Sequence, residues 1–190
     1  MGDRTSVTLI LAGHIETVIA LKAVCEAIEA ENMSFDWDES CADADEVAVA
    51  IGEAVARGEK TLTFVVQEKN YGNLDEVEGA CTEHNVAFSY AWDAGASYGA
   101  GCKAFTPDHG MSETTADGDS HATVELAALQ KALKTNDPLA AVRELVSDAE
   151  LASGEALPPL SISDAVKAFM ASDVSLVDVP DDVPLEGGEG

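Results

Sequence analysis

A serine between two glycines is the first sequence feature that could indicate catalysis. The run Gly95-Ala96-Ser97-Tyr98-Gly99 matches the G-x-S-x-G pattern of hydrolase nucleophiles, in which a tight strand-to-helix turn exposes the serine hydroxyl. Here the motif continues into Gly101 and a strand-like stretch instead of a helix. The spacing therefore favours a glycine-rich hairpin loop, and a serine hydrolase acting through Ser97 stays open as the enzymatic alternative.

Four potential zinc ligands lie in the same part of the chain, namely Cys81, His84, Cys102 and His109. The intervals are C-x2-H and C-x6-H, and the second is not a usual zinc knuckle spacing. Cys81 also falls on the apolar face of an expected helix, where a buried thiol is the ordinary outcome. We therefore assign no metal site, no cofactor and no catalytic residue from the sequence.

Carboxylates crowd a stretch that contains no lysine or arginine, between Lys22 and Arg57. Acid pairs that do general acid-base work or hold a hard cation need apolar surroundings or a defined ligand loop, and the pattern has neither. A solvated face is the favoured interpretation. The candidate anionic interaction face comprises Glu29, Glu31, Asp36, Asp38, Glu39, Asp43, Asp45 and Glu46.

The whole chain is strongly anionic. Its 190 residues include 36 acids and 10 bases, which gives a formal net charge of −26. Such a field repels phosphate backbones, so we expect no direct binding of nucleic acid. Apolar runs fall short of the ~20 residues that a membrane helix needs, and the apolar run near the start is too short for a signal peptide, so we expect a cytoplasmic protein with no membrane partner.

Apolar periodicity predicts the elements that position these residues. Helices are expected near residues 15–28, 43–57, 73–85, 121–134, 137–146 and 163–170. Their capping residues are Asp43 with Glu46, Asn73 with Glu76, Asp137 ahead of Pro138, and Ser163; Asn85 and Gly58 close two of the helices. A short fifth strand is expected over residues 102–106.

An internal repeat organises the first half. Shifting the sequence by 55 residues places SVTLIL (6–11) on TLTFVV (61–66) and MSFDWD (33–38) on FSYAWD (88–93). The pattern predicts an α+β fold in which duplicated βαβ units form a ferredoxin-like sheet of four or five strands with a C-terminal helical appendage. The helix expected between the halves keeps a doubly wound, three-layer α/β fold as the alternative.

Composition divides the chain into four parts. Residues 1–110 form the α/β domain, with the duplication over 6–38 and 61–93; residues 111–120 are the linker; residues 121–173 are the helical appendage; and residues 174–190 are an acidic extended tail.

Residues 70–105, NYGNLDEVEGACTEHNVAFSYAWDAGASYGAGCKAF, contain an acidic helix, His-Asn, an aromatic-rich strand and Tyr-Gly-Ala-Gly. This stretch resembles a family of uncharacterised small acidic proteins encoded by phages, plasmids and bacterial genomic islands. The resemblance implies a mobile-element accessory protein and carries no site residues.

Two function classes follow from these observations. The leading hypothesis is a non-enzymatic protein-interaction module, because the C-terminal amphipathic helices need a surface to cover; its partner is another protein or a second copy of the chain. The alternative is a DNA-mimicking inhibitor, of the anti-restriction or anti-CRISPR type, whose target is a basic nucleic-acid-binding protein. Adaptation to high salt would explain the acidity without any partner.

Overall fold

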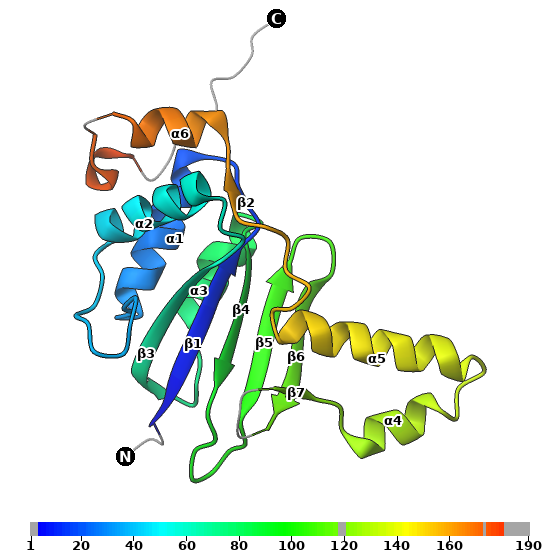
Figure 1. Ribbon diagram of the computed structural model, residues 1–190. Coiled ribbons are helices and arrows are strands. Elements are labelled where there is room, and N and C mark those ends of the chain that lie inside the picture. The colour runs from blue at the N-terminus through cyan, green and yellow to red at the C-terminus, as the bar shows by residue number, and fades with distance from the viewer. Residues whose placement is uncertain (1–3, 118–120, 173, 181–190) are drawn as a thin grey trace, which may run out of the picture.

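The computed structural model describes residues 4–117, 121–172 and 174–180, which form helices on both faces of an antiparallel sheet (Figure 1). The strands are β1 (Arg4–Ala12), β2 (His14–Ile15), β3 (Leu62–Asn70), β4 (Ala87–Trp92), β5 (Gly101–Thr106), β6 (Gly110–Ala116), β7 (Ala122–Thr123) and β8 (Ser161–Ile162). The helices are α1 (Val18–Ala30), α2 (Ala44–Arg57), α3 (Asp75–Glu83), α4 (Leu126–Ala132), α5 (Pro138–Ala152) and α6 (Asp164–Met170), with a 3-10 turn over Leu176–Asp178.

Six strands form the main sheet in the order β3-β1-β4-β5-β6-β7, and all neighbours run antiparallel. The predicted α+β class is confirmed. The doubly wound alternative is wrong, because that fold requires a mostly parallel sheet. Strand β1 lies inside the sheet, between β3 and β4, and β2 pairs separately with β8.

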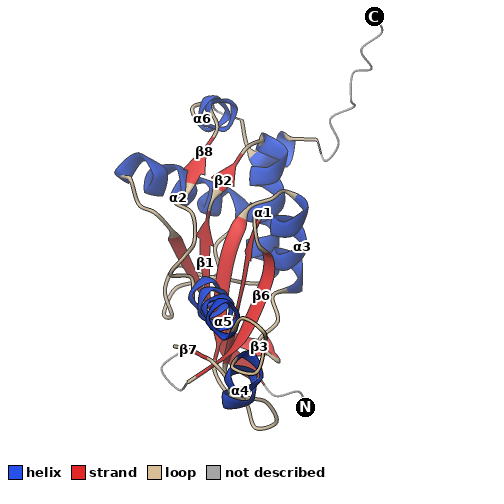
Figure 2. Ribbon diagram, turned by 90° about the vertical axis from the view of Figure 1, so that its right-hand side faces the viewer, coloured by secondary structure: helices blue, strands red, loops and turns tan. Residues whose placement is uncertain are grey.

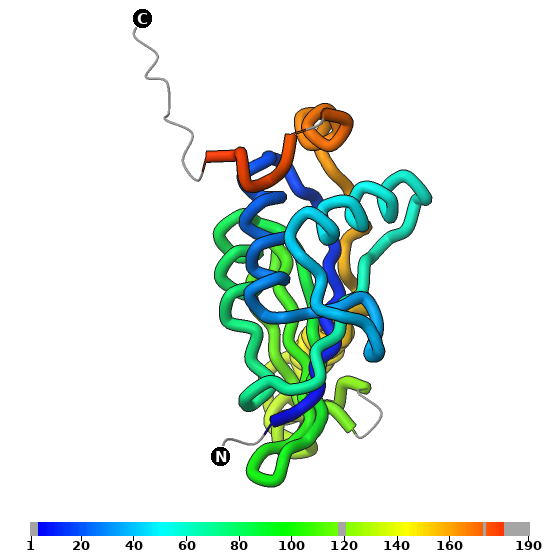
Figure 3. Tube along the Cα trace, turned by 90° about the vertical axis from the view of Figure 1, so that its left-hand side faces the viewer, coloured from blue at the N-terminus to red at the C-terminus, as the bar shows by residue number. Residues whose placement is uncertain are grey.

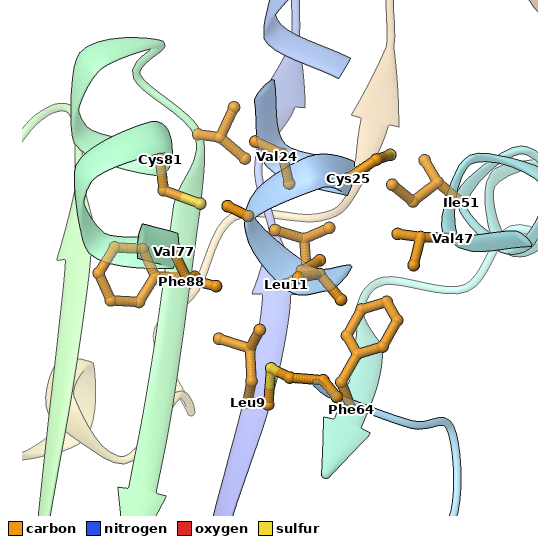
Figure 4. Packing of buried hydrophobic residues seen from close by; sticks show 14 of the residues in the cluster. Leu9, Leu11, Val24, Cys25, Val47, Ile51, Phe64, Val77, Cys81 and Phe88 are labelled. Atoms are coloured by element: carbon orange, nitrogen blue, oxygen red, sulfur yellow. The ribbon is translucent and has the colours of Figure 1, made fainter. Parts of the chain in front are cut away.

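The main core lies between this sheet and three helices. Alternate residues of β1, including Leu9 and Leu11, point to the face that α1 covers, and both are fully buried. Figure 4 shows Val24 of α1, Val47 of α2 and Val77 of α3 converging on these leucines. The helical spacing of the apolar residues thus places α1, α2 and α3 on one face of the sheet.

The opposite face is covered by α5 and the chain that follows it (Figure 2). Helix α5 lies against β6 and β5, and the turn after it passes close to β1 and β4. At Gly154 (φ +85°) a Cβ atom would lie 2.9 Å from the Ser89 hydroxyl and 3.2 Å from Ile10. This close approach requires glycine, both for the left-handed backbone and for the space.

The strand expected over residues 33–38 is reduced to one bridge between Ser34 and Val65. Ser34 donates its hydroxyl to the carbonyl of Asp36, and the Asp36 carboxylate accepts from the Trp37 amide at 2.7 Å. These local bonds turn the backbone out of the sheet. Strand β3 is therefore an edge strand instead of a central one, and the ferredoxin-like duplication is not confirmed.

The linker expected over residues 111–120 differs from the structure. Residues 110–116 form β6, which pairs with β5 along its length, and Gly110 (φ +74°) makes the turn into it. Threonines 114 and 115 favour an extended backbone, a preference that the polar composition of the stretch obscured. Residues 118–120 lie outside the described residues.

Most of the predicted caps are present. Asp43 and Glu46 form a capping box on α2, Asp137 accepts from the Ala140 amide at 3.0 Å, and Ser163 accepts from the Val166 amide at 3.2 Å. The cap expected from Asn73 on α3 is wrong, since that helix has no cap from its own neighbours in the sequence.

The C-terminal part of the described chain returns to the first helices (Figure 3). Helix α6 lies against α1 and α2, and the next residues are fixed by Asp45, which accepts from the Ser175 hydroxyl at 2.8 Å and the Leu176 amide at 3.1 Å. Leu176 is buried, and Lys22 donates to the Val179 carbonyl at 2.7 Å. Residues 174–180 of the expected tail thus pack on the domain, and residues 181–190 lie outside the described residues.

Candidate functional site

The G-x-S-x-G run lies in the loop between β4 and β5, which pair as an antiparallel hairpin, so no helix follows Ser97. Its glycines make room for aromatic rings. A Cβ atom at Gly101 would lie 2.2 Å from Trp92, and one at Gly95 would lie 2.5 Å from the Tyr98 ring. The Trp92 indole also donates to the Gly99 carbonyl at 3.1 Å. Packing therefore explains Gly95 and Gly101, whereas a Cβ atom at Gly99 would meet nothing within 4 Å.

The cysteines of the sequence-level zinc set are core residues. Burial raises the pKa of Cys81 to about 12, and burial followed by the nearby Glu113 charge raises the pKa of Cys102 to about 11. Both thiols therefore stay protonated at neutral pH, whereas a metal binds the thiolate. Among the described residues, no three His, Cys, Asp or Glu side chains are grouped closely enough to hold a metal ion.

The candidate anionic face is divided between structural and exposed carboxylates. Glu31 is buried, pairs with Lys69, and its other oxygen accepts from the Glu76 amide at 2.9 Å, at the start of α3. Glu29 accepts from the Ala44 amide at 3.2 Å, at the start of α2. The remaining members that accept hydrogen bonds are Asp36, Asp43, Asp45 and Glu46.

Asp38 and Glu39 are exposed, and within the described residues they show no side-chain hydrogen bond. Six of the eight candidate acids therefore hold backbone amides or side chains of the same chain. Carboxylates at helix starts satisfy amides that have no partner inside the helix and complement its dipole. The acids that the sequence suggested as one charged interaction surface therefore act in large part as hydrogen-bond acceptors within the chain.

A second charged cluster was not recognised from the sequence. Glu78 of α3 accepts from Lys103 of β5 at 2.6 and 2.8 Å and from the Tyr90 hydroxyl of β4. Burial, and then the hydrogen bond to the Glu78 carboxylate, raises the pKa of Tyr90 well above its usual range. The cluster fastens α3 to two strands, and no local pattern indicates it because its members come from three separate elements.

Helices α4 and α5 form a hairpin that projects from the sheet (Figure 1). Only the C-terminal end of α5 is buried, at Leu151 and Ala152. The outer part carries Leu126, Leu133 and Leu139 with 69%, 57% and 61% of their surfaces exposed. Large apolar side chains that remain exposed together are typical of a surface that contacts another molecule.

A groove runs along the outer surface of α2. Asp45, Val49 and Glu53 follow at i, i+4 and i+8 and form a ridge between two hollows. The hollow toward α6 has a volume of about 620 Å³ and is lined by apolar groups that include Phe169 and Met170. The other has a volume of about 670 Å³ and is rimmed by carboxylates. Val49 is 59% exposed between the two acids of the ridge.

Met170 closes part of the apolar hollow. A Cβ atom at Gly52 would lie 2.5 Å from the Met170 methyl group, so the glycine lets α6 approach α2. The sequence pattern predicted a short helix near residues 163–170, which contains Phe169 and Met170. It did not show that they form the wall of a groove, since that requires the return of the chain to α2.

Comparisons of this chain with family models, with curated proteins and with solved structures find no match. Among the described helices, none combines the length and the apolar composition that crossing a membrane requires.

Proposed function

We propose that this chain is a non-enzymatic protein-interaction module that binds its partner through the α4–α5 hairpin. The observation that carries the proposal is the exposure of leucines on a helical pair that extends beyond the sheet. On α5, Leu139 and Val146 lie at i and i+7 and share one outer face, with 61% and 45% of their surfaces exposed. An apolar helix face of this kind gains free energy when a partner removes it from water.

The hairpin also has few constraints from its own chain. Residues 138–140 are exposed, as are 143 and 144, and the buried residues of α5 lie at its other end. Replacing the outer leucines should therefore leave the fold nearly unchanged, because surface substitutions of this type shift stability by about 0.5 kcal/mol. Binding and folding can be separated in one experiment.

The test compares wild type with Leu133→Ser/Leu139→Ser and with a matched control, Met111→Ser, which removes an exposed methionine (42%) from β6. Each protein is immobilised and used to capture proteins from its native cell lysate, and self-association is followed by light scattering. We expect the hairpin variant to lose complexes that the control retains. A wild-type chain that is strictly monomeric and captures nothing would refute the proposal.

The enzymatic alternative is tested separately. Ser97→Ala should leave any esterase activity of the purified chain unchanged, because Ser97 lies in the loop of an antiparallel hairpin and no helix follows it. Loss of a measurable activity in that variant alone would favour the hydrolase instead.

We also propose that the first 93 residues descend from a duplicated ferredoxin-like unit in which one outer strand has shrunk. The sequence shift of 55 residues carries Ser34 onto Ser89 and Ile10 onto Val65. Both corresponding pairs exist: Ser34 bridges Val65, and Ser89 pairs with Ile10, each antiparallel. The two halves thus share one pairing register around β1 and β3.

The helices of the two halves also end alike. Asn32 after α1 and Asn85 after α3 both have φ +56°, and the amide of the next residue returns to the helix in each case. Cross-strand NOEs between Ser34 and Val65 and between Ser89 and Ile10 check the shared register. A different register at the first pair would contradict the duplication.

A further inference from the structure

We propose that the partner of the α4–α5 hairpin is a second copy of this chain, whose α2–α6 groove receives it in a head-to-tail assembly. This inference rests on the proposed function and names the occupant of the hairpin surface. Its first support is charge. Residues 125–144 contain three acids and three bases and are neutral, so the rest of the chain carries the whole −26. A neutral hairpin is repelled by another copy less than an acidic surface is.

The bases of the hairpin are available for a partner. Lys131, Lys134 and Arg143 are exposed, and the structure gives them no ion pair within the described residues. Most bases elsewhere are engaged, as Lys69 is with Glu31 and Lys103 with Glu78; among the described residues outside the hairpin, Lys60 has no ion pair. In a chain with 36 acids and 10 bases, three unpaired cations on one projecting element indicate an acidic target.

The target surface has the complementary pattern. Along the α2 ridge, the apolar residue Val49 lies between two acids, Asp45 and Glu53. On the outer face of α5, the base Arg143 lies between two apolar residues, Leu139 and Val146, at i, i+4 and i+7. When the rows are set side by side, Arg143 lies opposite Val49, between two carboxylates. Asp45 also accepts from Ser175 and Leu176, and Glu53 also pairs with Arg57 at 3.1 Å, so the guanidinium would share these acceptors.

The groove itself suits an apolar helix. Its hollow of about 620 Å³ is walled by Phe169 and Met170, and α2 carries no base before its last residue, Arg57. Lys167 lines the same hollow but is paired with Asp164 at 3.0 Å. The surface therefore offers an apolar floor with a mainly anionic rim.

A single chain does not satisfy its own groove. The hairpin and the α2–α6 groove lie on opposite sides of the molecule (Figure 1), and α5 is fixed to the sheet by Leu151 and Ala152. A contact between two different surfaces leaves each pair of copies with one free hairpin and one free groove, on different copies, so it generates open chains of molecules instead of closed dimers.

The test uses two variants that each remove one half of the junction. The tip variant is Leu139→Ser/Arg143→Ser, and the groove variant is Val49→Lys/Glu53→Lys. The control is Lys60→Ser/Met111→Ser, which removes an exposed base and an exposed apolar group elsewhere. Circular dichroism and thermal unfolding confirm that each variant folds, and sedimentation velocity over a concentration series measures association.

We expect the wild type and the control to form dimers and longer species as concentration rises. Each junction variant alone should be monomeric, with association weakened on the order of tenfold or more. An equimolar mixture of the two variants should form a 1:1 dimer that does not grow, because one intact hairpin and one intact groove remain.

Three outcomes would overturn the assembly. They are a monomeric wild type, a groove variant that still associates, which would indicate hairpin-to-hairpin pairing, and a mixture that stays monomeric although the wild type associates. The proposed function fails separately, since it requires only that the hairpin variant loses captured proteins or self-association. A monomeric wild type whose hairpin captures a different protein would refute the assembly and preserve the interaction module.

Discussion

Glu31 connects three elements through one carboxylate. It pairs with Lys69 of β3 and accepts from the Glu76 amide of α3, and its side chain is 6% exposed. We predict that Glu31→Gln destabilises the fold by about 3 kcal/mol, because it leaves a mostly buried lysine without its counter-charge. Urea unfolding measures the loss. The matched control is Glu68→Gln, which breaks an exposed pair with Arg4 and should cost less than about 1 kcal/mol.

Similar losses in both variants would show that the burial of Glu31 adds nothing to stability.

The sequence placed Glu31 among solvated acids, because charge runs usually face water. Its actual role depends on residues 38 and 45 positions away, which no local spacing indicates. By contrast, the capping box of Asp43 and Glu46 was predicted correctly, since both partners lie within one helical turn.

Tyr90 should make the stability of the fold fall at high pH. Burial, and then the hydrogen bond to Glu78, raises the pKa of Tyr90 in the folded chain above the usual ~10 of the unfolded chain. The folded state therefore holds this proton more tightly, and the stabilisation is complete below pH ~10 and is lost as the pH rises above it. We expect the advantage of wild type over Tyr90→Phe to shrink by about 1 kcal/mol between pH 9 and pH 11.

Urea unfolding at several pH values checks this difference. Tyr71→Phe, at a ring that is 55% exposed, is the matched control for the substitution itself. A difference between wild type and Tyr90→Phe that stays constant with pH would contradict the proposed role of the buried hydroxyl.

At the scale of elements, substitutions in the β4–β5 hairpin test whether its glycines are required for packing or belong to the motif of a serine enzyme. Gly101→Ala should destabilise by roughly 1–3 kcal/mol, because its Cβ would lie 2.2 Å from an indole ring that is held on its other side at Gly72. Gly99→Ala meets nothing within 4 Å and should change stability by less than about 0.5 kcal/mol. Thermal unfolding and the fluorescence of Trp92 report both effects.

Equal effects of the two substitutions would contradict this explanation of the glycines.

The β4–β5 hairpin was predictable from the glycines and the strand pattern on either side of them. The position of each strand in the sheet was not. Strand β3 has a continuous apolar run yet lies at the edge, because residues 34–37 turn away after one bridge and Gln67 donates to the Trp37 carbonyl there. The pattern of apolar and polar side chains indicates which faces of a strand are buried. Whether the strand lies at the edge of the sheet depends instead on what covers its backbone.

For the whole molecule, the charge is expected to act on stability more than on chemistry. Six of the eight candidate acids accept hydrogen bonds inside the chain, so these positions depend on the fold. The remaining excess of carboxylates repels itself across the surface, and this repulsion weakens as salt shortens the screening length from ~10 Å at 0.1 M to ~3 Å at 1 M. We predict that the free energy of unfolding rises with NaCl concentration.

A charge-reduced variant separates screening from other effects of salt. Asp38→Asn/Glu39→Gln removes two exposed acids and changes the net charge from −26 to −24. It should be more stable than wild type by roughly 0.5 kcal/mol at low salt, and the gap should close near 1 M NaCl, where the repulsion it relieves is already screened. Urea unfolding of both proteins at the two salt concentrations measures the gap. If the variant's advantage is absent at low salt or persists unchanged at 1 M, self-repulsion does not govern stability, and the acidity of the surface would then need an explanation through its partners.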